Sequence, residues 1–398
     1  MKLLIRSLLF ILLIVTSTQL LTHFIPYYNL LDEILMLILI GLTSLYYNKI
    51  KISKKKALIL VIFITIFLIS SVYNFYNLIP LIIKSLYYIK TLLVFSVISF
   101  LSIKFLEDKD LTRIYKWLLF FCVLSIFEFI YIQFFYFDGV VKYQIWDLTL
   151  KSRGGIYRAA ALTGHPISLG MMALMTLIFA IERSRKTNWK HILIISATII
   201  VSGSRIPLLL AMIYSLIKTV DIRFLKIKDL KMKYLYLLLV PTVVILSVFN
   251  IGKYIESTND VNASRGMAIS KGAILFLNLK NILVGTGVGS FGSFESVEYN
   301  SPIYEKIDYP RHYQEILTTT NRGSGIESFL FMILVEMGLI GASLYYLLLI
   351  PIKNSYSFIQ LFLVLSLIIY SMAYPIYTLP YVFLLTSLFP NFQINKNA

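Results

Sequence analysis

Apolar residues gather in long runs along the chain, and the breaks between the runs hold the charged and turn-forming residues. A hydrocarbon core of about 30 Å needs roughly 20 apolar helical residues. Such runs occupy 3–21, 30–47, 57–73, 86–103, 114–137, 159–181, 191–204, 206–220, 234–250, 326–350, 356–373 and 376–389. The pattern therefore predicts about twelve membrane-spanning helices.

Two pairs of these runs are short and broken in the middle. The break at 203–207 reads Gly-Ser-Arg-Ile-Pro, and the break at 374–375 reads Tyr-Pro. Proline removes a backbone donor and disfavours helix at the residue before it. We interpret the pairs at 191–220 and 356–389 as tight hairpins of two short helices, and one long kinked helix per pair is the alternative.

The composition agrees with a membrane protein. Of 398 residues, 58% are hydrophobic and 14% are charged, whereas a soluble domain has about 25% charged residues. We expect one integral membrane domain over 1–398, an all-α polytopic helix bundle with a large extracytoplasmic loop at 251–325. The net charge of +17 could indicate nucleic-acid binding, but in so apolar a chain it more often records membrane orientation. No nucleic-acid partner is therefore expected.

The basic residues fix an orientation for these helices. Most Lys and Arg side chains fall in alternate breaks, in the first residues and at 49–56, 104–116, 183–190 and 218–233. Short loops rich in Lys and Arg lie on the cytoplasmic side. The alternation predicts a multi-pass protein of the bacterial inner membrane with both termini in the cytoplasm, and it places 138–158 and 251–325 outside.

Arginines stand out among the basic residues on the predicted outer side. They are Arg153, Arg158, Arg205, Arg265, Arg311 and Arg322. The planar guanidinium group matches phosphate oxygens in pairs, so an outward-facing set indicates a phosphorylated lipid ligand. Arg205 lies at the tip of a short hairpin, where we expect it below the membrane surface. Snorkelling to lipid phosphate is the alternative.

Few residues are suited to acid–base chemistry on that side. Glu128 lies inside a predicted span and is a site candidate by default, although a hydrogen-bonded structural role suits it equally. Glu327 begins another span, where the helix dipole alone would favour it. His165 and His312 lie near arginines but lack metal-ligand spacing, so we expect neither a metal nor a cofactor.

Two segments of the 251–325 loop have a distinct pattern. Residues 265–284 alternate apolar side chains with Lys271 and Lys280, which predicts a helix lying on the membrane surface. The glycine-rich run from Gly285 to Gly292 follows it. A nucleotide-binding loop would need a preceding strand and a following helix. We interpret the run as a backbone hairpin or, at most, an anion-binding nest.

Four of these segments resemble one family. They are RAAALTGHP at 158–166, Gly203-Ser204-Arg205, Ser264-Arg265 followed by LVGTGVGSF at 283–291, and the span that begins ESFL at 327 and continues through EMGLIG at 336–341. Their order, spacing and sidedness are similar to those of the O-antigen polymerase and ligase superfamily of membrane glycosyltransferases (Wzy/WaaL type). The resemblance covers about 158–345, and no single motif within it is specific.

The resemblance implies a metal-independent enzyme that uses a glycan linked to undecaprenyl diphosphate. Arg158, Arg205 and Arg265 would bind the diphosphate, with Arg311, Arg322, His165 and Glu128 as further candidates. Glu327 first, and His312 second, would take the proton of the attacking sugar hydroxyl. The expected partners are the lipid-linked donor and acceptor, membrane lipids and a regulator of chain length.

The resemblance favours a polymerase of surface polysaccharide repeat units, such as O-antigen or capsule. Ligases of the family usually show a His-Asn-like pair just before the closing span, where this chain reads Gly325-Ile326-Glu327-Ser328. A ligase remains the first alternative. A polysaccharide or lipid transporter is the second, and transporters tend to place ionisable groups near the membrane midplane.

Overall fold

The computed structural model describes residues 2–18, 21, 25, 27–46, 54–73, 75–135, 152–153, 156–183, 188–219, 261–311, 314, 328–349 and 358–371. Within these ranges the regular secondary structure is helical apart from one short pair of strands. It divides into two compact units. The first comprises 1–50, 94–225 and 379–398, and the second comprises 51–93 and 226–378. The expectation of one integral domain stays a prediction.

The first unit contains most of the N-terminal half of the chain. Its helices are α1 (Lys2–Ser17), α2 (Tyr28–Ser44), α5 (Asp108–Phe135), α6 (Pro166–Arg183), α7 (Trp189–Val201) and α8 (Arg205–Thr219). The antiparallel strands β1 (Ser152–Arg153) and β2 (Ile156–Tyr157) and the 3-10 turn η3 (Ala161–Thr163) lead into α6. Helix α4 (Leu78–Phe105) begins in the second unit and ends in this one.

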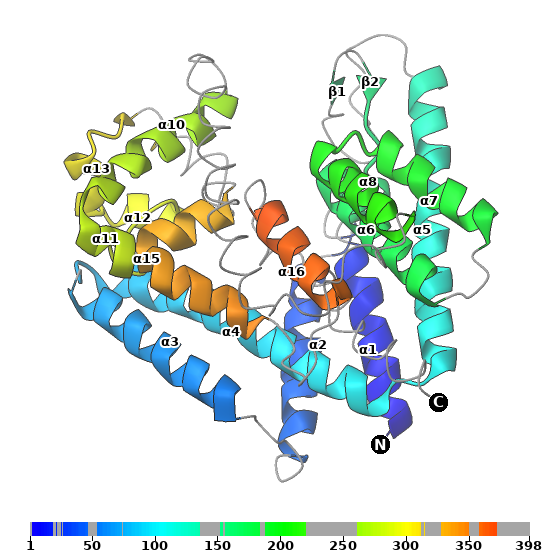
Figure 1. Ribbon diagram of the computed structural model, residues 1–398, viewed down its shortest axis with the longest axis horizontal. Coiled ribbons are helices and arrows are strands. Elements are labelled where there is room, and N and C mark those ends of the chain that lie inside the picture. The colour runs from blue at the N-terminus through cyan, green and yellow to red at the C-terminus, as the bar shows by residue number, and fades with distance from the viewer. Residues whose placement is uncertain are drawn as a thin grey trace. The chain divides into compact units, whose positions relative to one another are not determined.

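Helix α6 forms the centre of the first unit. It packs against α5, α7 and α8, which lie around it in Figure 1. All residues from Leu169 to Ala180 are buried, because neighbours cover every side of the helix. Gly170 permits one close approach, since a Cβ there would lie 2.8 Å from the Ser202 hydroxyl and 3.0 Å from the Pro207 ring. The α7–α8 turn is thereby held against the first turns of α6.

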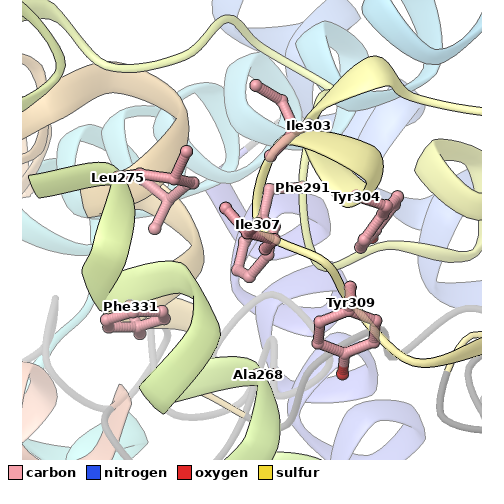
Figure 2. Packing of buried hydrophobic residues seen from close by; sticks show 9 residues of the cluster. Ala268, Leu275, Phe291, Ile303, Tyr304, Ile307, Tyr309 and Phe331 are labelled. Atoms are coloured by element: carbon pink, nitrogen blue, oxygen red, sulfur yellow. The ribbon is translucent and has the colours of Figure 1, made fainter.

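The second unit combines long helices with a set of short ones. It contains α3 (Lys54–Tyr73), the first part of α4, α10 (Val261–Ala273), η5 (Ile274–Leu277), α11 (Leu279–Val284), α12 (Phe294–Glu298), α13 (Pro302–Lys306), α15 (Phe329–Leu348) and α16 (Phe358–Ser371). A buried cluster joins the short helices to α15. Figure 2 shows its side chains, among them Leu275, Phe291, Ile307 and Phe331.

Two glycines lock the glycine-rich run against α15. Helix α15 is broken at Gly338, whose φ of 66° is left-handed. A Cβ at Gly338 would lie 2.5 Å from the Leu283 carbonyl group, and one at Gly285 would lie 2.3 Å from the Glu336 carbonyl oxygen. Any larger residue would force these two backbones apart. The glycines therefore serve close packing between α11 and the break in α15.

The helices agree well with the predicted runs. Ten of the twelve runs coincide with described helices, while 234–250 and 376–389 lie outside the described residues. Helices α4, α5 and α15 are long and apolar enough to cross a membrane, which supports a membrane location. Shorter apolar stretches include Lys56–Val72 within α3, Pro166–Glu182 within α6, and α7. The number of twelve spans and their orientation stay predictions.

The structure corrects three local expectations. Helix α4 begins at Leu78 rather than at 86. The predicted surface helix at 265–284 is interrupted by η5 and by extended backbone at Asn278. The closing span carries a sharp break at Gly338. The hairpin prediction for 191–220 is confirmed, because α7 ends at Val201 and α8 starts at Arg205 after a turn in which Gly203 has a φ of 58°.

Candidate functional site

Arg158 lies against the turn between α7 and α8. The β1–β2 hairpin ends one residue before it, and the amide of Ala159 donates to the Val201 carbonyl at 3.0 Å. The Arg158 side chain crosses Gly203 so closely that a Cβ at that glycine would lie 2.5 Å from the arginine Cδ. Arg205 stands two residues further along and starts α8 with an exposed side chain. The structure thus brings two of the predicted phosphate-binding arginines to one turn.

Glu128 fixes the backbone that follows Arg158. It projects from α5, and one of its carboxylate oxygens accepts the amides of Ala160 and Ala161 at 3.0 and 2.5 Å. A carboxylate that accepts two backbone donors is strongly oriented. Glu128 therefore has the hydrogen-bonded structural role that the sequence left open. It holds the backbone two and three residues after Arg158.

His165 terminates the same segment at the start of α6. Its Nδ1 accepts the amide of Ile167 at 3.2 Å, so the ring proton lies on Nε2 in this arrangement. Thr163 tightens the turn by donating its hydroxyl to the Ala160 carbonyl at 2.5 Å. His165 here stabilises a helix start, as an N-cap side chain does.

The remaining predicted site residues belong to other parts of the chain. Arg265 lies in α10, with its side chain outside the described part, and Arg311 is exposed just after α13; both belong to the second unit. Their approach to Arg158 and Arg205 stays a prediction. Glu327, His312 and Arg322 lie outside the described residues.

The second unit contains a buried polar cluster that the sequence did not indicate as a site. Glu336, on α15, is fully buried, and its carboxylate accepts the Tyr88 hydroxyl at 2.6 Å and the Phe291 amide at 3.3 Å. Lys84, one turn before Tyr88 on α4, is 2% exposed, and its Nζ lies 3.9 Å from Glu295. The spacing of Lys84 and Tyr88 within an apolar run was the available signal, but the predicted span excluded Lys84.

The glycine-rich run supplies donors to this cluster. The amides of Thr286 and Gly287 donate to the Val335 and Glu336 carbonyls at 2.8 and 3.0 Å. The amide of Gly292 donates to the Tyr304 hydroxyl at 3.0 Å. Burial raises the pKa of that hydroxyl above its ordinary value, so it stays protonated. These amides bind groups of the protein itself, which supports the backbone-hairpin interpretation rather than an anion-binding nest.

The two polar centres differ in chemistry. The turn brings together Arg158, which is part-buried, and Arg205, which is exposed, and two arginines suit binding of an anionic ligand from outside the fold. The Glu336 cluster is enclosed by side chains and backbone, which suits a structural role. We take the turn as the candidate functional site.

We compared the chain with known protein families, curated proteins and solved structures. No protein-family model, curated protein or solved structure matches this chain.

Proposed function

We propose that the protein is a membrane glycosyltransferase that polymerises oligosaccharide repeat units linked to a lipid diphosphate, producing a surface polysaccharide such as O-antigen or capsule. The observation that carries the proposal is the packing of Arg158 across Gly203 beside Arg205. These residues come from two of the four segments that resemble the polymerase and ligase superfamily.

The arginines would act on the diphosphate. An ion pair at about 4 Å is worth about 4 kcal/mol at an effective dielectric constant near 20. Arg158 and Arg205, joined by Arg265, would hold the diphosphate and stabilise the negative charge that grows on it as it leaves. Stabilising a developing charge with preorganised donors is usually the largest contribution to catalysis.

The reaction is a substitution at the anomeric carbon of the donor. The acceptor hydroxyl oxygen forms the new C–O bond, while the bond from that carbon to the phosphate oxygen breaks and its electron pair leaves with the lipid diphosphate. The hydroxyl proton passes to a base, for which Glu327 is the first candidate and His312 the second. The residues need no metal for these steps. Undecaprenyl diphosphate is the proposed carrier, and a chain-length regulator is a proposed partner.

The proposed location follows from the lipid substrate. The enzyme would lie in the bacterial inner membrane with both termini in the cytoplasm and with Arg158 and Arg205 toward the outer leaflet. The helices α4, α5 and α15 support membrane insertion, and the distribution of Lys and Arg supports this orientation.

The test is the polysaccharide made by cells that carry variants of the two arginines. Arg158→Gln keeps the Cβ and Cγ groups that pack on Gly203 but removes the charge, and Arg205→Ala removes an exposed side chain. We expect both variants to lose the polymer ladder on a gel and to accumulate single repeat units. Arg113→Ala is the matched control, since Arg113 is 68% exposed and pairs with Asp110 at 3.8 Å.

Two other results would speak against a polymerase. Full-length polymer from either variant at normal protein levels would refute the proposal. Finished polymer that accumulates on the carrier in a deletion strain would select a ligase instead.

A further inference from the structure

The segment from η5 to α11 exposes several large apolar side chains. Leu277 is 86% exposed and Leu279 is 68% exposed, and Ile274 and Leu283 on the same segment are also exposed. Large apolar side chains that cluster on a surface mark an interaction site. We call these four residues, with the adjacent Lys280 and Lys306, the η5–α11 surface.

This surface rests on a fixed framework. Leu275, between Ile274 and Leu277, points the other way into the cluster shown in Figure 2, where it lies near Ile307. Asn278 caps α11 by accepting the Lys280 amide at 3.0 Å, and the Asn281 side chain donates to the Leu275 carbonyl at 3.0 Å. The turn that exposes Leu277 is therefore held by buried packing and side-chain hydrogen bonds.

The η5–α11 surface lies close to the end of a helical hairpin. Helix α11 packs on α3 and α15. The run that follows it reaches the α3–α4 turn, where the Tyr76 hydroxyl donates to the Gly289 carbonyl at 2.7 Å and a Cβ at Gly289 would lie 2.6 Å from the Pro80 carbonyl. Helix α4 is a candidate membrane span. Helix α3 has three lysines, at 54–56, at its N-terminal end, and its C-terminal end leads into the α3–α4 turn. The exposed leucines thus lie toward the end of α3 that is remote from its lysines.

Two lysines, Lys280 and Lys306, lie beside the leucines together with Asn278 and Asn281. The exposed Glu305 and Asp308 flank Lys306. Lys306 lines an open hollow of about 590 Å³ together with Leu277, Leu279 and Ile307. Lys280 follows Leu279 directly, and Lys271 pairs with Asp308 at 3.6 Å. Apolar side chains flanked by lysines match a bilayer boundary, where acyl chains meet anionic phosphate groups.

We propose that the η5–α11 surface anchors this segment in the bilayer, with Leu277 and Leu279 among the acyl chains and Lys280 and Lys306 at the phosphates of acidic phospholipids. The partner is the lipid surface that surrounds the protein. This inference does not depend on the proposed glycosyltransferase activity.

The test places a fluorescent probe at Leu277 in the full-length protein. Cys122 is buried and is replaced by serine, and single cysteines at Leu277 or Glu298 are labelled with an environment-sensitive fluorophore. The protein is reconstituted in nanodiscs of phosphatidylcholine and phosphatidylglycerol. We expect the emission maximum of the probe at 277 to be shifted to the blue. We also expect nitroxides on the acyl chains to quench its fluorescence. The probe at the exposed Glu298 should be quenched by aqueous iodide instead.

Two results would overturn the lipid anchor. Quenching of the 277 probe by iodide to the same degree as the 298 probe would place it in water. Protection from both quenchers would show that protein covers it, either a second copy or another partner.

The lysines are tested separately in the labelled Leu277→Cys protein. Lys280→Gln combined with Lys306→Gln should lower acyl-chain quenching in nanodiscs containing phosphatidylglycerol to the level seen in pure phosphatidylcholine. Equal quenching with and without the lysines, in both lipid compositions, would refute their role at acidic headgroups.

Discussion

At the scale of single residues, the candidate site depends on a glycine as much as on arginines. Gly203 has a φ of 58°, and it provides the space that the Arg158 side chain occupies. The aliphatic stem of an arginine can pack along a surface while its guanidinium group makes polar contacts beyond it. Gly203 therefore positions Arg158 beside Arg205 without contacting any ligand itself.

Replacing Gly203 should disable the site without touching either arginine. The added Cβ of Gly203→Ala would lie 2.5 Å from Arg158 Cδ, and the left-handed backbone disfavours alanine. We expect a loss of stability of about 1–3 kcal/mol and loss of polymer, measured as the melting temperature in detergent and as the ladder on a gel.

Gly41→Ala is the control for this change, because a Cβ at Gly41 meets nothing within 4 Å in helix α2. It should preserve polymer length and leave the melting temperature equal or slightly higher. A Gly203→Ala protein that behaves like Gly41→Ala would contradict the packing described for Arg158.

At the scale of helices and loops, the Glu336 cluster ties four segments together. The backbone carbonyl of Glu336 accepts the Ser70 hydroxyl of α3 at 2.8 Å and the Gly287 amide. The Glu336 carboxylate accepts the Tyr88 hydroxyl of α4 and the Phe291 amide. The break at Gly338 lies two residues further along α15. The carboxylate therefore holds the glycine-rich run at the point where α15 changes direction.

Glu336→Gln tests this assignment with almost no change in shape. The amide oxygen of glutamine can replace only one carboxylate oxygen, so either Tyr88 or Phe291 loses its acceptor. A buried donor without an acceptor costs about 1–3 kcal/mol. We expect a lower melting temperature and faster amide hydrogen exchange at 286–291.

Glu305→Gln on α13 is the control, since Glu305 is exposed. Unchanged exchange at 286–291 in the Glu336→Gln protein would show that other contacts hold the loop.

The sequence predicted elements better than contacts. Apolar runs located ten helices because membrane-length hydrophobicity is a local property. A shared role for Arg158 and Arg205 was assigned through the family resemblance, since nothing local reveals that Arg158 crosses Gly203. The break at Gly338 could not be predicted, because it depends on the backbone of Leu283 in a distant segment.

At the scale of the whole molecule, the account requires one orientation in the membrane. The α4–α5 turn contains Glu107, which bonds Arg6 of α1 and Lys109. The positive-inside rule counts only the lysines and arginines of this region, among them Lys104, Lys109 and Arg113. It predicts that the α4–α5 turn lies in the cytoplasm and the α3–α4 turn outside. The candidate site would then face the side on which lipid-linked repeat units are polymerised.

Cysteine accessibility tests this orientation directly. In a Cys122→Ser background, a membrane-impermeant thiol reagent should label Asn77→Cys in spheroplasts, because residue 77 lies in the α3–α4 turn. Lys109→Cys, at a 63% exposed position, should react only after the membrane is permeabilised. The reverse pattern would place the termini outside and would contradict the proposed sidedness.

The central claim is that Arg158 and Arg205 bind the diphosphate of a lipid-linked glycan during polymerisation. The most direct measurement uses purified protein in liposomes, supplied with the carrier-linked repeat unit, and follows both product length and released lipid diphosphate. We predict that the wild-type protein makes a ladder and releases carrier with each linkage, and that Arg158→Gln and Arg205→Ala do neither while Arg113→Ala does both. Ladder formation by either arginine variant at the wild-type rate would contradict the account.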